Sequence, residues 1–201
     1  MKNHANKKDS GDPAGLARVE TPFLALDAVR MQRNIVRLRE RMGRLGVGLR
    51  PHLKTGKSAE VARRMFDGGV GPATVSTLRE AEYFADAGFT DMLYAVGIAP
   101  HKLERVVALR KRGVDLCVIL DSPEQARAVA EISRRCDERL PALIEIDCDG
   151  HRGGLPPDDP RLIDIAGLLE KGGAQMRGVL DHAGESYHSR SEAELIAAAE
   201  K

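Results

Sequence analysis

Short runs rich in Val, Ile and Leu alternate in this chain with longer stretches in which apolar residues recur at helical spacing. The alternation begins near Thr21, and runs such as LCVIL and ALIEI are apolar almost throughout. Strands of that kind are typical of a parallel sheet that is covered by helices. The sequence therefore predicts an α/β fold built from repeated strand–helix units.

Seven candidate strands begin roughly 20 to 35 residues apart, about the length of one strand, one helix and two short loops. They are Phe23–Asp27, Gly48–Lys54, Ala73–Thr77, Asp91–Val96, Asp115–Leu120, Ala142–Asp147 and Gly178–His182. An open doubly wound sheet and a closed (β/α)₈ barrel both satisfy this periodicity. The number of strands favours the barrel, although a barrel needs eight strands to close. We expect a TIM-type barrel that is truncated after about seven βα units.

Such an unclosed barrel would expose two strand edges, so the isolated chain is expected to be poorly stable or to associate. Residues 1–20 are polar, and their apolar residues follow no regular spacing. We expect these residues to form a mobile arm that precedes a single barrel domain over residues 21–201. Helix starts are predicted after the N-cap residues Asp27, Ser58 and Ser122, and helix ends at Gly88 and Gly113.

Composition and charge exclude several classes of partner. The formal net charge is +1, so no global field points to nucleic acid or to an anionic membrane, and 3% aromatic residues argue against single-strand binding. No apolar stretch is long enough to span a bilayer or to form a signal peptide. Cys117, Cys136 and Cys148 form no CxxC pair. We expect a cytoplasmic protein whose partners are neither nucleic acid nor membrane.

Ionisable side chains gather where the predicted strands end, in RPHLKTGK, VSTLRE, EIDCDGHRGG and LDHAGESYH. The carboxyl ends of the strands form the active face in both candidate architectures. Arg50, His52 and Lys54 alternate along one strand and are expected to point inward, with Lys54 at its end. A desolvated amine near Arg50 is more easily held neutral, as Schiff-base chemistry requires. The alternative is a solvated lysine at a strand–helix junction.

Four segments of the chain together resemble the N-terminal barrel of the alanine-racemase-like, fold-type III pyridoxal-phosphate enzymes. They are PHLKT, the opening TPFLALDAVRMQRNI, the stretch ATVSTLREAEYFADAGFTDMLYA and IEIDCDGHRGGL. Within that group the chain is most similar to the D-threonine aldolase and D-serine dehydratase branch, from about Thr21 to Tyr187. The resemblance implies a lyase of D-amino acid metabolism in which Lys54, the predicted catalytic residue, forms a Schiff base with pyridoxal 5'-phosphate. It implies a small D-3-hydroxy amino acid as substrate and allows a homodimer.

The same resemblance assigns further residues to the cofactor site. Arg152 is expected to reach the cofactor's phenolic oxygen or a substrate carboxylate, and pairing with Asp147 or Asp149 is the alternative. His182 is expected to line the cofactor pocket, although a structural role is equally open. Ser186 and Tyr187 follow the last predicted strand, where barrels frequently bind phosphate. His52, Thr77 and Glu80 are expected in the pocket wall, and no metal ligands are predicted in this chain.

The chain also departs from the branch. Gly56 stands where the branch has a histidine in KTHK, and Glu185 replaces the second histidine of HAGHSY, so aldolase and dehydratase both stay open. In the branch a C-terminal β-rich domain bears a divalent metal, so that metal is expected only in a full-length form. Two other hypotheses remain: a single-domain, non-catalytic pyridoxal-phosphate-binding protein of cofactor homeostasis, and a degenerate remnant that binds nothing.

Overall fold

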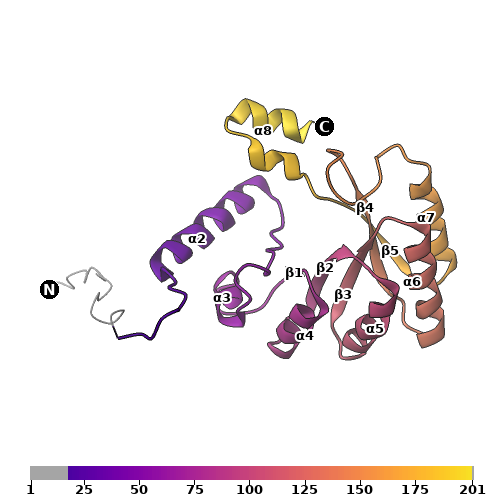
Figure 1. Cartoon of the computed structure of the whole chain (residues 1–201), viewed down its shortest axis with the longest axis horizontal. Coiled ribbons are helices and arrows are strands. Elements are labelled where there is room, and N and C mark those ends of the chain that lie inside the picture. The colour runs from indigo at the N-terminus through magenta and orange to yellow at the C-terminus, as the bar shows by residue number, and fades with distance from the viewer. Residues whose placement is uncertain (1–17, 201) are drawn as a thin grey trace.

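The structure, a computed structural model, describes residues 18–200 and contains one parallel sheet (Figure 1). Its five strands are arranged in the order β1-β2-β3-β4-β5. They are β1 (Ala73–Val75), β2 (Asp91–Gly97), β3 (Asp115–Leu120), β4 (Pro141–Ile146) and β5 (Gln175–Asp181). Strand order thus follows chain order, and each neighbouring pair is parallel.

Helices connect the strands: α4 (Leu78–Asp86), α5 (Leu103–Lys111), α6 (Pro123–Cys136) and α7 (Arg161–Lys171), with the short η1 (Pro100–Lys102) before α5. When each strand lies next to the strand that follows it in the chain, right-handed crossovers place all connecting helices on one face of the sheet. A doubly wound sheet would reverse the strand order and carry helices on both faces. The topology therefore confirms the α/β prediction and is that of a barrel wall.

The first two predicted strands do not form. Residues 23–27 lie in coil with Leu24 and Leu26 exposed, and no strand pairs with them in the described part of the chain. In the second segment only His52 forms a bridge, to Thr74. Pro51 has no N–H to donate, so a longer ladder would be interrupted there. The prediction of about seven units is thus corrected to five strands in residues 18–200, with only an isolated bridge at His52 in place of the second predicted strand.

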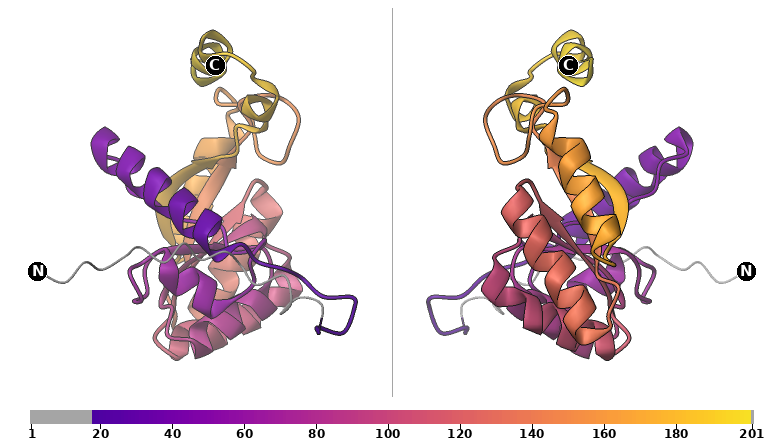
Figure 2. Two further views of the ribbon diagram at one scale, coloured as in Figure 1. Left: turned by 90° about the vertical axis from the view of Figure 1, so that its left-hand side faces the viewer. Right: turned by 90° about the vertical axis from the view of Figure 1, so that its right-hand side faces the viewer.

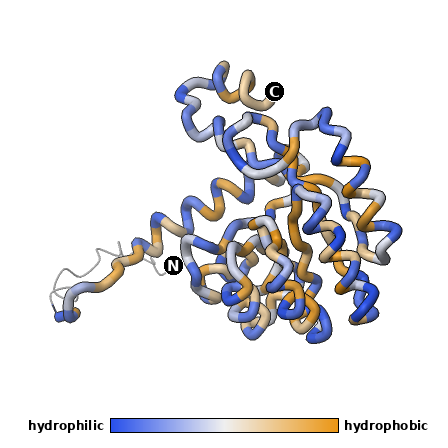
Figure 3. Tube along the Cα trace, turned by 45° about the vertical axis from the view of Figure 1, so that its right-hand side comes forward, coloured by the Kyte–Doolittle hydropathy of each residue, from blue (hydrophilic) through white to orange (hydrophobic). Residues whose placement is uncertain are grey.

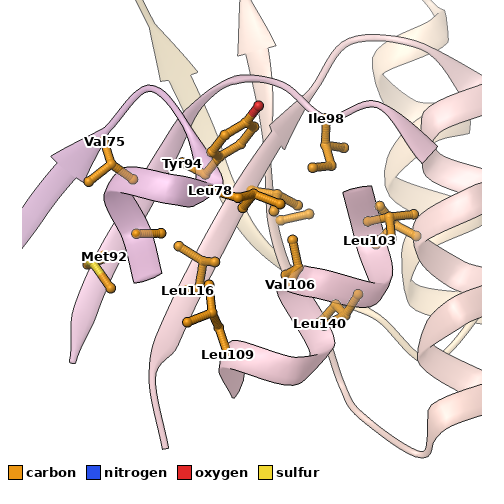
Figure 4. Close-up of a cluster of buried hydrophobic side chains, with 14 of the residues drawn as sticks. Val75, Leu78, Met92, Tyr94, Ile98, Leu103, Val106, Leu109, Leu116 and Leu140 are labelled. Atoms are coloured by element: carbon orange, nitrogen blue, oxygen red, sulfur yellow. The ribbon is translucent and has the colours of Figure 1, made fainter. Parts of the chain in front are cut away.

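The main core lies between the sheet and its helices. Leu116, Val118 and Leu120 of β3 are fully buried and belong to this cluster. Figure 4 shows Leu116 among side chains of α4 and α5, including Leu78, Val106 and Leu109. On the opposite side Leu93, Cys117 and Ile119 form a smaller cluster with Leu143 and Leu180. Apolar side chains on both faces of the strands explain why their sequences read as continuous apolar runs.

Local capping fixes where the helices begin. Asp27 accepts a hydrogen bond from Arg30 N at the start of α2 (Ala28–Leu45), Ser58 caps α3 (Ala59–Arg64), and Ser122 caps α6. Each of these residues satisfies an N–H group that lacks a partner within its helix. Gly88 and Gly113 follow α4 and α5 with φ of 92° and 85°, which L-residues rarely adopt. The predicted helix signals are confirmed at all five positions.

Two helices lie at the periphery. Only Ile35 is buried in α2, and no residue is buried in α8 (Glu192–Ala199), which follows the short helix η2 (Gly184–His188). Both views in Figure 2 show α8 apart from the sheet and one end of α2 projecting from the body. In Figure 3 the strands are hydrophobic inside the body, whereas α2 alternates between hydrophobic and hydrophilic residues. The sheet and α4 to α7 therefore carry most of the packing.

Candidate functional site

Lys54 lies in a tight turn at the carboxyl end of the bridge beside β1. Leu53 N donates to Thr74 O at 2.8 Å and Thr74 N donates to Pro51 O at 2.9 Å, which aligns this segment with β1. The chain turns directly afterwards, and Lys54 is exposed. Its amino group makes no ion pair within residues 18–200. The structure thus leaves a lysine amine accessible at the edge where the strands end.

His52 supports this turn. Its Nδ1 accepts from Lys54 N at 3.3 Å, and its Nε2 lies 3.3 Å from Ser76 Oγ. Burial lowers the pKa of His52, and the nearby Lys54 charge lowers it further. The ring is therefore neutral near pH 7, and because Nδ1 accepts, the proton is assigned to Nε2, which donates to Ser76. His52 holds the backbone of Lys54.

Thr77 and Glu80 have structural partners. Thr77 Oγ1 accepts from Glu80 N at 3.0 Å and so caps α4. The buried Glu80 accepts from Ser76 N at 2.8 Å and pairs with Lys57 at 3.4 Å. This arrangement resembles a capping box, except that Glu80 accepts from Ser76 N, one residue before the N-cap Thr77. These residues stabilise the wall beside Lys54.

Arg152 lies in a segment that we call the arginine loop, residues 147–154. The chain leaves β4 at Ile146 and returns so that Leu155 forms a parallel bridge with Ile146. Arg152 is exposed and forms no ion pair within the described residues, so the alternative of pairing with Asp147 or Asp149 is not observed. Asp147 instead accepts from Gly150 N at 2.9 Å. The guanidinium is left available to an anionic ligand.

His182 directly follows β5, and its Nε2 is buried with no hydrogen-bond partner among the described residues. Burial lowers its pKa, and the charges of Arg152 and Lys54 lower it further. Lys54 follows the bridge beside β1 and His182 follows β5, so both residues lie at the carboxyl end of the sheet.

Ser186 and Tyr187 lie in η2. Ser186 Oγ donates to Ala183 O at 2.7 Å, so this hydroxyl already has an acceptor. The side chain of Tyr187 is 68% exposed, and its ring lies edge-on to His182 at a centroid distance of 5.9 Å. Tyr187 therefore stands next to the candidate site, and Ser186 would have to rotate before it could donate to a phosphate.

Arg50 does not lie with these residues. Its guanidinium binds both carboxylate oxygens of Asp91, at 2.7 and 3.1 Å, at the amino end of β2. Because parallel strands run in one direction, this end is opposite to the end at which Lys54 lies. The expectation that Arg50 points into the same mouth and acts on Lys54 is wrong.

Two carboxylates at the mouth were missed from the sequence. A Cβ added at Gly153 would lie 3.2 Å from Glu145 Oε2 and 3.6 Å from Asp121 Oδ2, so both face this glycine. Burial raises the pKa of Glu145, and Asp121 raises it further. Asp121 Oδ2 also accepts from Gly154 N at 2.9 Å. Both residues lie at carboxyl ends of strands, and this position was the signal that could have identified them.

The site and the singly wound parallel sheet together define a barrel-wall domain with a lysine at its mouth. The chain matches the family described as alanine racemase, N-terminal domain, over residues 26–200. It belongs to this family, as the resemblance of its motifs implied.

Among its relatives is the D-threo-3-hydroxyaspartate dehydratase of Delftia sp. HT23, 48% identical over 187 residues, with a TM-score of 0.88 to its solved structure. That alignment covers 92% of this chain and 49% of the dehydratase. The D-serine dehydratase of Dictyostelium discoideum is 29% identical over 88% of this chain and 48% of its own length. The D-threonine aldolase of Filomicrobium marinum is 30% identical over 92% and 50% of the two chains, with a TM-score of 0.82.

The chain thus spans about half the length of the curated relatives that it matches. Their names are those of lyases, dehydratases and aldolases, that act on D-3-hydroxy amino acids. Within residues 18–200 no helix combines the length and apolarity needed to cross a membrane, and the cytoplasmic location expected above stays a prediction.

Proposed function

We propose that this chain is the cofactor-binding part of a pyridoxal-phosphate-dependent lyase that acts on D-3-hydroxy amino acids. One observation carries the proposal: the accessible amine of Lys54, the unpaired cation of Arg152 and the orphaned Nε2 of His182 all lie at the carboxyl end of the sheet, where Arg152 and His182 both lie beside Gly184. A buried polar atom without a partner costs roughly 1 to 3 kcal/mol. A ligand that offers His182 a hydrogen bond would recover that cost, so these residues fit the cofactor.

Each residue then has a role at a stated atom. When bound, pyridoxal phosphate supplies a conjugated ring that accepts electrons from the bond broken at the substrate α-carbon. Lys54 Nζ would hold the cofactor, and this amine would also be the group that moves a proton at the substrate α-carbon. Arg152 would orient an anionic oxygen of cofactor or substrate, His182 would line the cofactor pocket, and Tyr187 would offer a hydroxyl to the phosphate.

Dehydration is the favoured reaction because the relative that is 48% identical is named a D-threo-3-hydroxyaspartate dehydratase. We propose the same substrate class, D-3-hydroxyaspartate and its analogues. Aldol cleavage is the second candidate, since relatives at 28% identity are named aldolases. A mutant of the Delftia dehydratase has been solved in a metal-free form. Residues 18–200 hold no cluster of three His, Cys, Asp or Glu side chains that could bind a metal, so we propose that any metal is held by a further part of a longer protein.

The test begins with cofactor binding by the 201-residue chain. The chain is mixed with pyridoxal phosphate, its visible absorbance is recorded, the linkage is reduced with borohydride, and the modified lysine is located by mass spectrometry. We expect the label on Lys54, and we expect Lys54→Ala to lose it. Lys111→Ala, at an exposed lysine in the last turn of α5, is the matched control and should keep the wild-type spectrum.

Labelling of several lysines, or of none, would count against the proposal and support a degenerate remnant. Formation of a 2-oxo acid and ammonia from D-3-hydroxyaspartate identifies a dehydratase, whereas glycine and an aldehyde identify an aldolase. Specific labelling of Lys54 supports the cofactor site whether or not either product forms, because this chain is proposed to be only the cofactor-binding part of the lyase.

A further inference from the structure

The arginine loop and η2 meet at a single carboxylate. Asp149 Oδ2 accepts from Glu185 N at 2.8 Å, and these two residues are 36 positions apart in the chain. The other oxygen, Asp149 Oδ1, accepts from His151 N at 3.3 Å within the arginine loop. One side chain is thus hydrogen-bonded to the loop that carries Arg152 and to the segment that carries Ser186 and Tyr187.

The two segments also approach closely at Gly184. A Cβ added at this glycine would lie 3.2 Å from Arg152 Cδ, 3.6 Å from Asp149 Oδ2 and 3.8 Å from His182 Cδ2. The aliphatic part of Arg152 therefore packs over the backbone of η2, and His182 lies on the same side. The backbone N–H of Glu185 lowers the pKa of Asp149, so the carboxylate is ionised near pH 7 and the bond is charge-assisted.

We propose that Asp149 is a positioning residue, which fixes η2 against the arginine loop and thereby holds Arg152 and His182 at the mouth. In this role Asp149 contacts neither the cofactor nor the substrate. It acts through the backbone of Glu185 and through the packing of Arg152 on Gly184. Its importance for catalysis rests on the proposed function, but the coupling of the two segments is a property of the chain alone.

The experiment compares hydrogen exchange in the wild-type chain with that in Asp149→Ala and Asp149→Asn. Removing the acceptor should raise exchange in peptides from residues 183–189 about tenfold, the ratio that corresponds to losing one hydrogen bond of ordinary strength. Exchange in β3 should not change. Asp149→Asn keeps an oxygen that can accept from Glu185 N, so it should stay close to wild type. Asp158→Ala, at an exposed aspartate, is the matched control and should leave all peptides unchanged.

A second readout is the dissociation constant of pyridoxal phosphate, which should rise about tenfold in Asp149→Ala and much less in Asp149→Asn. Unchanged exchange over residues 183–189 in Asp149→Ala would overturn the proposal. Faster exchange in β3 as well would also overturn it, because the effect would then be global. If the wild-type chain fails to label Lys54, the proposed function falls, while the exchange data still decide the coupling.

Discussion

Gly154 shows how far a single residue controls the candidate site. It closes the arginine loop with a φ of 112°, in a region that L-residues rarely adopt. A Cβ there would lie 2.7 Å from Ile146 C and 2.8 Å from Asp147 N, which are backbone atoms of β4 and the loop itself. The return of the chain beside β4, and with it the placement of Arg152, therefore requires glycine at this position.

We predict that Gly154→Ala lowers the free energy of unfolding by about 2 to 3 kcal/mol, because strain at φ and backbone overlap act together. Gly150→Ala is the control: its φ is 72°, but no atom lies within 4 Å of the added Cβ. It should cost about 1 kcal/mol. Urea unfolding followed by circular dichroism gives both values. Equal losses in the two variants would show that contact with β4 is unimportant.

Ion pairs at the amino ends of the strands connect elements that are far apart in the chain. Asp115, the first residue of β3, accepts from Arg177 of β5 at 2.7 and 2.9 Å, reaching past β4. Arg110 of α5 binds the same carboxylate at 2.8 Å and also Glu138 at 2.7 Å. These groups, like the Arg50–Asp91 pair, lie at the end of the sheet opposite to Lys54. They therefore contribute to the stability of the barrel wall.

The pKa of Asp115 lies below its ordinary value, chiefly because of Arg177 and then Arg110, although burial opposes the shift. As the pH falls, the Asp115 carboxylate therefore takes up a proton in the unfolded chain before it does so in the folded chain. The ion pairs of Asp115 stabilise the fold above the ordinary carboxyl pKa of about 3.9. This stabilisation is lost as the pH falls through the lower value in the folded state.

We predict that Asp115→Asn is less stable than wild type at pH 7 and that the difference shrinks below about pH 4. Thermal unfolding measured between neutral and acidic pH tests this. Asp158→Asn, at an exposed aspartate without an ion pair in the described residues, should follow the wild-type pH dependence. A stability difference between wild type and Asp115→Asn that grows as the pH falls would contradict the assignment of this stabilisation to the Asp115 carboxylate.

At the scale of the whole molecule, apolar surface stays exposed on the last strand and on α8. Val179 of β5 is 60% exposed although its partner Ile144 is buried, and Leu195 and Ile196 of α8 are each 51% exposed. No described strand pairs with the outer edge of β5. Unpaired edges and contiguous apolar surface favour association between chains.

We predict that the 201-residue chain associates reversibly at micromolar concentration and that Val179→Lys reduces this association. The substitution should hardly change the stability, because the side chain is mostly exposed. Val70→Lys, at a valine that is 47% exposed in the loop before β1, is the control and should associate like wild type. Sedimentation velocity over a range of concentrations measures the effect. A wild-type chain that stays monomeric and melts cooperatively would contradict this prediction.

The sequence by itself determined the α/β class and the helix caps, and it predicted Lys54 and Arg152 as residues of the candidate site. Hydrophobic periodicity and helix capping each depend on only a few neighbouring residues. The N-cap residues Asp27, Ser58 and Ser122 could therefore be identified without the fold. The Lys54 and Arg152 motifs were equally local, and they carried the family resemblance that the comparison confirmed.

Tertiary structure alone decided which predicted strands form and which side chains meet. Residues 23–27 have strand-like composition but no described neighbour, and a strand requires a partner to satisfy its backbone groups. Arg50 and Lys54 are four residues apart, yet Arg50 pairs with Asp91 at the amino end of the sheet while Lys54 lies at the carboxyl end. The contact of Asp149 with Glu185 likewise joins residues that are distant in the chain. Such pairings depend on the curl and register of the sheet, which no local pattern contains.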